Sequence, residues 1–447
     1  MPSFSGRYRY LEAGGAVLQE GACRLSFEAQ TLDLAPGSGA PLACDLADID
    51  AFSPGDYELS LKLYTGRTIL LTHFARDFQN LCHDLLEAWH ARVIQCLLLE
   101  DLEEISRFDG NAQLDSAEGE SSGRAEIRLY KSNLAILPEG ASGYSWRLAD
   151  IDNVDFDEGT YTLGLRSGQD RLILTRLAKR TREFIDKVQM AMTDISERSV
   201  STLHDLFPFL NPDQIQRAAA LMKEGRAAPV SDLNSIHPKT EETLIGNAVD
   251  KSLRPYFDML KSQTSAHGYF AGFKFIRPES EEAELAEPGE EPAPPAEKQT
   301  PTGTEEASGE AEEIAGEKAE TVLHWFFFPL KGSGASALSD VVAWEASSRG
   351  GRATYLFRLS RDGGQTANAV RESIRRLNRA IVLLNFRREP IYLPDDSLDA
   401  KPRFHRYAIA KRKIPALRQL RAAYLGRALH TSVEAWQKQV QTIISKA

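Results

Sequence analysis

Three side chains of metal-binding type are spaced for one face of a helix. The segment HDLLEAWH places His83, Glu87 and His90 at positions i, i+4 and i+7, and imidazole and carboxylate groups are ordinary zinc ligands. The apolar stripe of the same segment lies on the opposite side of such a helix, so we expect this face to meet water. Ligands on an exposed helix lack the surrounding groups that orient them in a metal site. We therefore predict a solvated polar face and no metal site.

Two pairs of carboxylates share a repeated segment. The segment is LADID, and its aspartates are Asp48 and Asp50 in the first occurrence and Asp150 and Asp152 in the second, 102 residues later. Paired carboxylates can serve as general acid and general base. In a strand, however, residues i and i+2 share one face while their apolar neighbours occupy the other. The pattern therefore favours a repeated structural motif at a sheet edge over a catalytic pair.

A glycine-rich segment, GSGASA at Gly332–Ala337, matches the glycine pattern of dinucleotide-binding loops. Such a loop must lead from a strand into a crossover helix, and here the next predicted strand begins within a few residues. We therefore predict a hairpin loop. The chain also has no P-loop, GxSxG or HExxH pattern. The expectation is no catalytic residue, no cofactor and a protein that is not an enzyme.

The end of the chain is basic. Gly351–Ala447 holds 20 Lys or Arg against 7 Asp or Glu, although the whole chain has a net charge of −11. The densest part is PRFHRYAIAKRKIPALRQLRAAYLGR. Its candidate anion-binding residues are Lys411, Arg412, Lys413, Arg418 and Arg421.

This basic region has three interpretations. The favoured one is a helical surface whose Lys and Arg stems cover apolar neighbours. In the second, the acidic segment Glu279–Glu320, with 15 Glu and 2 Lys, screens the basic region across a Debye length of about 8 Å. In the third, the region binds nucleic acid or another anionic surface, and Phe404, Tyr407 and Tyr424 are near enough to stack on bases. No recognised nucleic-acid motif accompanies the charge.

The repeat extends beyond LADID and defines the elements that hold it. At the same offset, the apolar residues Leu25, Phe27, Leu32 and Leu34 fall on Ile127, Leu129, Leu134 and Ile136. Downstream, alternation with period two indicates half-buried strands, and Gly66 and Gly168 mark tight hairpins. The first two hundred residues are therefore predicted to be a tandem duplication.

Each copy then changes to helical periodicity. The first stripe is Phe74, Phe78, Leu81, Leu85, Trp89 and Val93, and the second is Phe184, Val188, Met192 and Ile195. We expect short antiparallel strands followed by one amphipathic helix that caps an exposed end of the curled sheet, since its apolar face has no other partner within the copy.

This order of parts resembles the PH-like superfold, and the bacterial GRAM-like or PH-like domains in particular. The matching residues are Asp48, Ile49, Leu59, Leu61, Gly66 and Phe78 in the first copy and Asp150, Ile151, Leu163, Leu165, Gly168 and Phe184 in the second. The resemblance covers about residues 10–197. It implies binding of lipid, peptide or protein without catalysis. Members that bind phosphoinositides carry a basic cluster across the first hairpin, and this chain offers only Arg24 in one copy and Arg128 and Lys131 in the other.

The remaining segments complete an α+β organisation. We predict tandem PH-like barrel or sandwich modules, each capped by a helix, then a helical segment and a third strand-rich α+β domain with a helical tail. The predicted boundaries are 1–106 (first domain), 107–123 (linker), 124–198 (second domain), 199–261 (helical segment), 262–278 with 321–386 (third domain, a candidate degenerate PH-like copy), 279–320 (disordered acidic insertion) and 387–447 (basic helical region).

The totals agree with a cytoplasmic protein. Its 447 residues hold 42% hydrophobic and 26% charged residues, and no apolar run reaches the length of a membrane span or signal peptide. The four cysteines, Cys23, Cys44, Cys82 and Cys96, have no metal-like spacing and are predicted to be buried free thiols. We expect an adaptor or scaffold that binds protein partners. The alternative is nucleic-acid or anionic-surface binding through the basic region.

Overall fold

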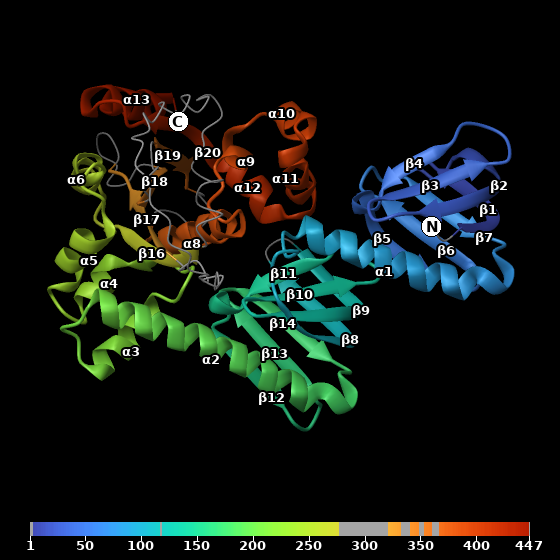
Figure 1. Cartoon of the computed structure of the whole chain (residues 1–447), viewed down its shortest axis with the longest axis horizontal. Helices are drawn as coiled ribbons and strands as arrows, with labels where there is room; N and C mark the ends of the chain where they lie inside the picture. The colour runs from blue at the N-terminus through green and yellow to red at the C-terminus, as the bar shows by residue number, and fades with distance from the viewer. Residues whose placement is uncertain are drawn as a thin grey trace, which may run out of the picture. The chain divides into compact units, whose positions relative to one another are not determined.

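The computed structural model describes residues 3–116, 119–276, 321–331, 340–347, 353–359 and 366–446. The chain divides into two compact units: unit 1 is Met1–Leu203, Arg376–Leu384 and Glu389–Tyr424, and unit 2 is His204–Arg375, Asn385–Arg388 and Leu425–Ala447. The fold is α+β, as predicted, with antiparallel sheets and helices (Figure 1). The acidic segment 279–320 and the loop Gly332–Ala337 lie outside the described residues.

The first module, β1 to α1, is a seven-stranded antiparallel sheet followed by a helix. The strands are β1 (Ser3–Leu11), β2 (Val17–Phe27), β3 (Thr31–Pro36), β4 (Leu42–Asp45), β5 (Ile49–Pro54), β6 (Glu58–Leu63) and β7 (Thr68–Thr72), and the helices are η1 (Leu46–Asp48), η2 (Ala75–Asp77) and α1 (Phe78–Cys96). The strand order is β4-β3-β2-β1-β7-β6-β5.

The second module, β8 to α2, repeats this plan. Its elements are β8 (Glu104–Ser116), β9 (Gly119–Tyr130), β10 (Asn133–Pro138), β11 (Tyr144–Arg147), η3 (Leu148–Asp150), β12 (Asn153–Asp157), β13 (Thr162–Ser167), β14 (Asp170–Thr175), η4 (Ala178–Arg180) and α2 (Thr181–Leu206). The order β11-β10-β9-β8-β14-β13-β12 matches that of the first sheet strand for strand.

Backbone details recur at matching places in the two modules. Gly66 and Gly168 have φ of +83° and +64° at the hairpins where the sequence predicts them, a conformation that costs glycine little. Tyr57 and Tyr161, which immediately precede the equivalent strands β6 and β13, also have positive φ, 55° and 52°. The predicted core positions of both copies are buried, including Leu25 and Ile127 at 0% exposure. The predicted duplication is therefore confirmed as a repeated architecture.

The predicted linker is wrong. Residues 107–116 and 119–123 belong to the paired strands β8 and β9, which pair from Glu104↔Tyr130 to Ser116↔Gly119. The second module therefore begins at β8, within the predicted first domain. Phe108, Gly110 and Ala112 alternate on the buried face, but glycine and alanine contribute so little hydrophobicity that the period-two pattern is hidden.

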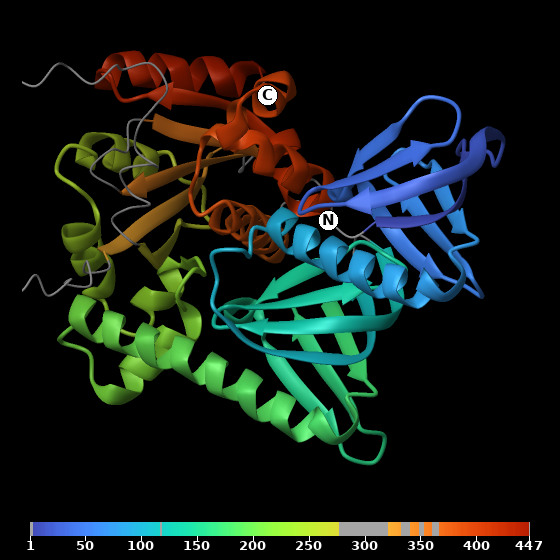
Figure 2. The ribbon, with the colours of Figure 1, turned by 45° about the vertical axis from the view of Figure 1, so that its right-hand side comes forward.

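Helix α1 packs on both modules of unit 1. In its own module, Trp89 stacks on Phe52 with ring centroids 5.9 Å apart, and α1 also lies alongside the strands of the second sheet (Figure 2). The approach is close, because a Cβ built on Gly143 would lie 2.7 Å from Val93 Cγ1. The two modules also share a backbone hydrogen bond, from Phe52 N to Glu139 O at 2.9 Å.

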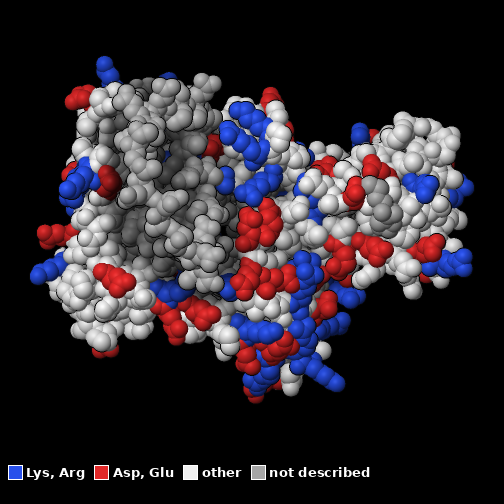
Figure 3. Space-filling view, in the orientation of Figure 1, with Lys and Arg blue, Asp and Glu red and all other residues white. Residues whose placement is uncertain are grey.

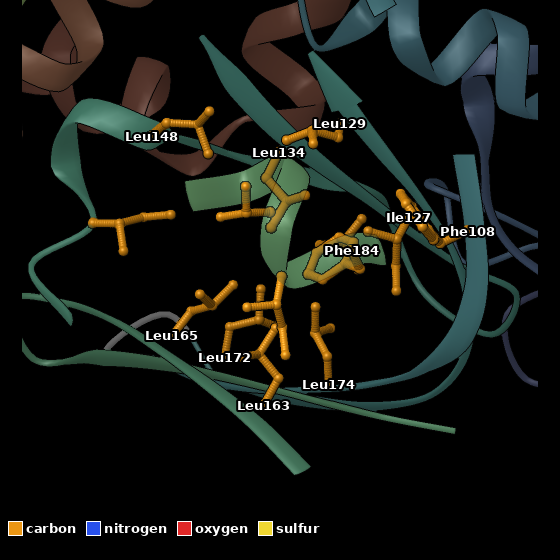
Figure 4. Packing of buried hydrophobic residues seen from close by; sticks show 14 of the residues in the cluster. Phe108, Ile127, Leu129, Leu134, Leu148, Leu163, Leu165, Leu172, Leu174 and Phe184 are labelled. Carbon is orange, nitrogen blue, oxygen red and sulfur yellow. The ribbon is translucent and has the colours of Figure 1, made fainter. Parts of the chain in front are cut away.

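The core of the second module lies between its curled sheet and α2. Leucines from both halves of the curled sheet converge on Phe184 of α2 (Figure 4). The Phe184 ring meets Phe108 edge to face, with centroids 4.9 Å apart, a favourable aromatic geometry. This helix closes the sheet as the sequence predicts.

Unit 2 contains a six-stranded antiparallel sheet in the order β15-β16-β17-β18-β19-β20. The strands are β15 (Ala228–Pro229), β16 (Phe270–Ile276), β17 (Thr321–Pro329), β18 (Val341–Ser347), β19 (Ala353–Arg358) and β20 (Tyr424–Leu429). Four of them, β16 to β19, lie within the predicted strand-rich third domain, 262–278 with 321–386. In contrast, β20 lies in the region 387–447 that was predicted to be helical throughout. The strand order differs from that of the two modules.

Helices precede and follow these strands along the chain. They are α3 (Pro212–Leu221), α4 (Val230–Asn234), α5 (Thr240–Ala248), α6 (Arg254–Ser262), α8 (Ala367–Leu383) and α13 (Val433–Lys446). The capping box of Asn211 and Gln214 starts α3, within the predicted helical segment 199–261. In the core, Phe257 of α6 meets Phe326 edge to face, with centroids 4.9 Å apart.

Acid should destabilise unit 2 through His324. Burial lowers the pKa of His324 to about 4, so the unfolded chain binds a proton there first as the pH falls below about 6.5. The part of the free energy of unfolding that depends on neutral His324 is then lost between pH 6.5 and 4. We expect His324→Leu to reduce this loss by about 2 kcal/mol, as measured by urea unfolding at pH 7.5 and 4.5. His204→Leu, at a histidine 67% exposed, is the control; an equal change there would refute the assignment.

Candidate partner-binding site

Each LADID segment forms a short 3-10 turn where the sheet passes from its fourth to its fifth strand. In the first module, Asp45 caps the turn by accepting a hydrogen bond from Ala47 N at 2.8 Å. Arg92 of α1, 5% exposed, holds Asp45 with two hydrogen bonds of 2.9 and 2.7 Å. Trp89 Nε1 donates to Ile49 O at 3.1 Å. Helix α1 therefore fixes the turn. The prediction that LADID lies in a strand is wrong for Leu46–Asp48, because β5 begins only at Ile49.

The aspartates of the first turn hold basic side chains of a distant helix. Helix α11 (Pro402–Lys413) places Lys413 Nζ 2.5 Å from Asp50 Oδ1 and 3.0 Å from Ile49 O. Arg412 Nη1 lies 3.3 Å from Asp48 Oδ1. The Lys413 side chain is 5% exposed, so its ammonium depends on these two acceptors.

Further contacts extend this site along α11. Ile409 packs against Ala47 and Cys96 in a small buried cluster. Arg406 pairs with Glu100 at 2.9 Å, beyond the end of α1. We call Ala47, Asp48, Ile49, Asp50, Cys96 and Glu100 the acidic edge. It combines two charged ends with a small apolar centre.

Burial changes the ionisation of this edge. It raises the pKa of Asp48, while Arg412 and Lys413 act in the opposite direction and Asp45 adds to the rise. Burial likewise raises the pKa of Glu100 against the effect of Arg406. An ionised carboxylate at either position is therefore less stable than in water even with its present cation, so the edge favours a positively charged occupant.

The second module also meets a basic side chain at its LADID turn. Arg379 of α8 lies 3.5 Å from Asp150 and 3.4 Å from Asp170, and it also hydrogen-bonds Ser167. The surroundings differ, because Arg147 stands where the first module has Asp45, and it lies 3.6 Å from Asp150. Asp152 is exposed and accepts a hydrogen bond from Gly168 N of its own module.

The five predicted anion-binding residues all contact acceptors of their own chain. They lie in α11 and α12 (Pro415–Ala423), beside α9 (Glu389–Tyr392) and α10 (Asp395–Ala400). Besides Arg412 and Lys413, Lys411 pairs with Asp395 at 2.7 Å, Arg418 donates to Arg412 O at 2.6 Å, and Arg421 donates to Leu393 O at 2.7 Å and pairs with Asp395 at 2.8 Å. Figure 3 shows basic side chains gathered over these helices with acidic ones beside them.

The expected solvated face of α1 is only partly correct. His83 and Glu87 are exposed, but His90 is 2% exposed. Its Nδ1 hydrogen-bonds Glu126 Oε2 of β9 at 3.0 Å. The helical pattern could not show this, because the second module covers the face of α1 that its own module leaves open.

Acid should also weaken this junction. Burial would raise the pKa of Glu126, but hydrogen bonds from His90 and Arg128 lower it to about 2. The stability from ionised Glu126 is full above pH 4.5 and is lost as the pH falls to about 2. We expect Glu126→Gln to cost about 2 kcal/mol at pH 6 and almost nothing near pH 2, by urea unfolding. Glu120→Gln, at an exposed site on the same strand, should cost little at both; a Glu126→Gln cost that is independent of pH would contradict the assignment.

Unit 2 brings together a hydroxyl, an imidazole and a carboxylate. Thr354 Oγ1 donates to Glu345 Oε2 at 2.7 Å, and His430 Nε2 lies 3.0 Å from the same hydroxyl and 3.4 Å from Glu345 Oε2. A nucleophile–base–acid triad needs the hydroxyl and the carboxylate on opposite nitrogens of the imidazole. Here one nitrogen faces both, and Thr354 is fully buried. With Trp436 Nε1 donating to Thr354 Oγ1 at 2.8 Å, the cluster anchors α13 to the sheet.

Sequence reasoning missed Arg379, Arg406 and Glu100. The sequence did hold a signal for Arg406, because Arg406, Ile409 and Lys413 have the i, i+3, i+7 spacing of one helical face. Among the described residues, no three histidines, cysteines or acidic groups are placed to hold a metal ion. In the same part of the chain, no helix is long and apolar enough to cross a membrane.

Comparisons with known proteins add no function. No family model matches the chain, and no curated protein matches it. Among solved structures, a Vav1 structure described as inhibited by an allosteric inhibitor is similar at 15% identity and a TM-score of 0.18, over 28% of this chain and 42% of that one. A protein of unknown function of the DUF3598 family from Nostoc punctiforme is similar at 10% identity and a TM-score of 0.14, over 37% and 75%. The chain thus spans less than half of that Vav1 structure.

Proposed function

We propose that the chain is a non-catalytic cytoplasmic adaptor whose two modules are PH-like domains that bind protein partners at their LADID turns. The repeated seven-strand order with a closing helix supports the PH-like assignment. The observation that carries the binding role is the acidic edge itself, since Asp48 and Asp50 bind the side chains of a helix about 360 residues away in the sequence. Four free thiols agree with a reducing compartment.

Nucleic-acid binding by the basic region has weaker support. The five basic residues that would contact phosphates have carboxylates or carbonyl oxygens of the chain as partners. Binding of phosphates there would first have to break these contacts. Lipid-headgroup binding is not favoured either, because Arg128 pairs with Glu126 and Lys131 with Glu103.

Cross-linking in lysate of the native organism tests the adaptor role. The full chain is cross-linked, and its partners and cross-linked residues are identified by mass spectrometry. We expect a specific protein whose cross-links surround a LADID turn and whose yield falls at least fivefold in Asp48→Asn/Asp50→Asn. The control is Asp56→Asn/Asp77→Asn, at two exposed carboxylates of the same module, and it should keep the yield. No partner, or a partner insensitive to the first pair, would overturn the proposal.

A further inference from the structure

We infer that the acidic edge recognises a basic amphipathic helix, and that α11 occupies it as an internal ligand which such a partner must displace. This inference rests on the proposed adaptor function and specifies the partner. The contacts define a pattern in α11: arginine at 406, isoleucine at 409 and an arginine–lysine pair at 412 and 413. The first, the second and the lysine lie at i, i+3 and i+7, so they share one face.

The first module builds the edge without help from α11. Arg92 of α1 holds Asp45, Asp45 caps the turn, and the turn presents Asp48 and Asp50. Trp89 directs the Ile49 carbonyl through its hydrogen bond. The acceptors Asp48, Ile49 O, Asp50 and Glu100 all lie between residues 48 and 100, and Ser142 of the second module adds a hydrogen bond to Asp50 Oδ1 at 3.3 Å. A preformed site of this kind can accept any helix that carries the same pattern.

The contact has the character of an exchangeable one. It combines ion pairs at both ends with an apolar centre of three residues, Ala47, Cys96 and Ile409. Burial raises the pKa of Asp48 and Glu100 at the two ends, while Arg412 and Arg406 lower it, so a cationic side chain at each end stabilises the ionised carboxylate. The Arg412 and Arg406 side chains are 33% and 37% exposed, so their ion pairs should weaken with salt, whereas the pair of Lys413, which is 5% exposed, is screened less.

The second module supplies a natural comparison. Arg147 replaces Asp45 next to its turn and meets Asp150, and Asp152 bonds its own backbone at Gly168 N. Part of the negative charge there is thus neutralised within the module. The same helix should therefore prefer the first module.

Fluorescence anisotropy with a labelled peptide of residues 401–414 (KPRFHRYAIAKRKI) tests the inference on the full chain. The double variant Arg412→Glu/Lys413→Glu should release its own α11 and bind the peptide at least tenfold more tightly than the wild-type chain. Adding Asp48→Asn/Asp50→Asn should abolish binding, and adding Asp152→Asn should not. Circular dichroism checks the folding of each variant, and Lys413→Ala replaces the double variant if that one does not fold.

Several results would overturn the inference. Equal peptide affinity for wild-type and released chains would do so, as would binding that survives Asp48→Asn/Asp50→Asn. A concentration-dependent dimer of the wild-type chain, with α11 cross-linked to the edge of a second copy, would replace the internal ligand by an intermolecular one. If the peptide fails but the cross-linked partner still depends on Asp48 and Asp50, the inference falls while the adaptor function stands; if that partner is absent too, both fall.

Discussion

Replacing Asp50 by alanine is expected to lower the free energy of unfolding by about 3 kcal/mol, because it leaves a nearly buried ammonium without its carboxylate. The Lys413 side chain is 5% exposed and lies 2.5 Å from Asp50. The Ile49 carbonyl remains as an acceptor at 3.0 Å, which keeps the effect below the largest values for buried pairs. Urea unfolding measures the loss, and hydrogen exchange should show reduced protection of α11.

The matched control is Asp152→Ala at the equivalent position of the second module. Asp152 is exposed and bonds the backbone of its own module, so we expect a smaller loss and unchanged exchange in α11. Equal losses for the two variants, or full protection of α11 in Asp50→Ala, would mean that the ion pair does not hold the helix.

Phe184→Ala is expected to cost about 3–5 kcal/mol, the range for a large aromatic side chain removed from a packed core. Phe184 is fully buried, and leucines from both halves of the curled sheet surround it (Figure 4). The variant also loses the edge-to-face contact with Phe108. Chemical unfolding provides the measurement.

Met190→Ala serves as the comparison on the same helix. Met190 is 65% exposed, and surface substitutions of this kind usually change stability by less than about 0.5 kcal/mol. A similar loss in both variants would show that α2 helicity, and not the core contact, determines the stability.

The sequence predicts the modules well because their cores are periodic. Leu25 and Ile127, on matching strands, are fully buried. The stripe with Trp89 in the first copy and the stripe with Phe184 in the second each become the apolar face of a closing helix. Residues 107–116 and 119–123 were misassigned because a segment rich in glycine and serine resembles a linker, even when its backbone pairs in antiparallel strands. Strand β20 is short and carries a glycine and an arginine, which weakens its pattern.

The candidate site was less accessible to sequence reasoning, because its halves lie far apart in the chain. Asp48 and Arg412 are 364 positions apart, and no local period links them. The aspartates were expected to be structural and the basic residues to cover a surface, but the structure pairs the two groups. His90 shows the same limit, since its partner Glu126 belongs to the other copy.

Because α1 packs on both copies, the two copies are not independent, interchangeable domains. A fragment ending after α1 would bare Val93 and His90 to water, and one starting at β8 would leave Glu126 without its imidazole partner. Excision of either copy should therefore yield an insoluble or partly unfolded product. We therefore expect the two copies to fold as one unit, with neither stable without the other.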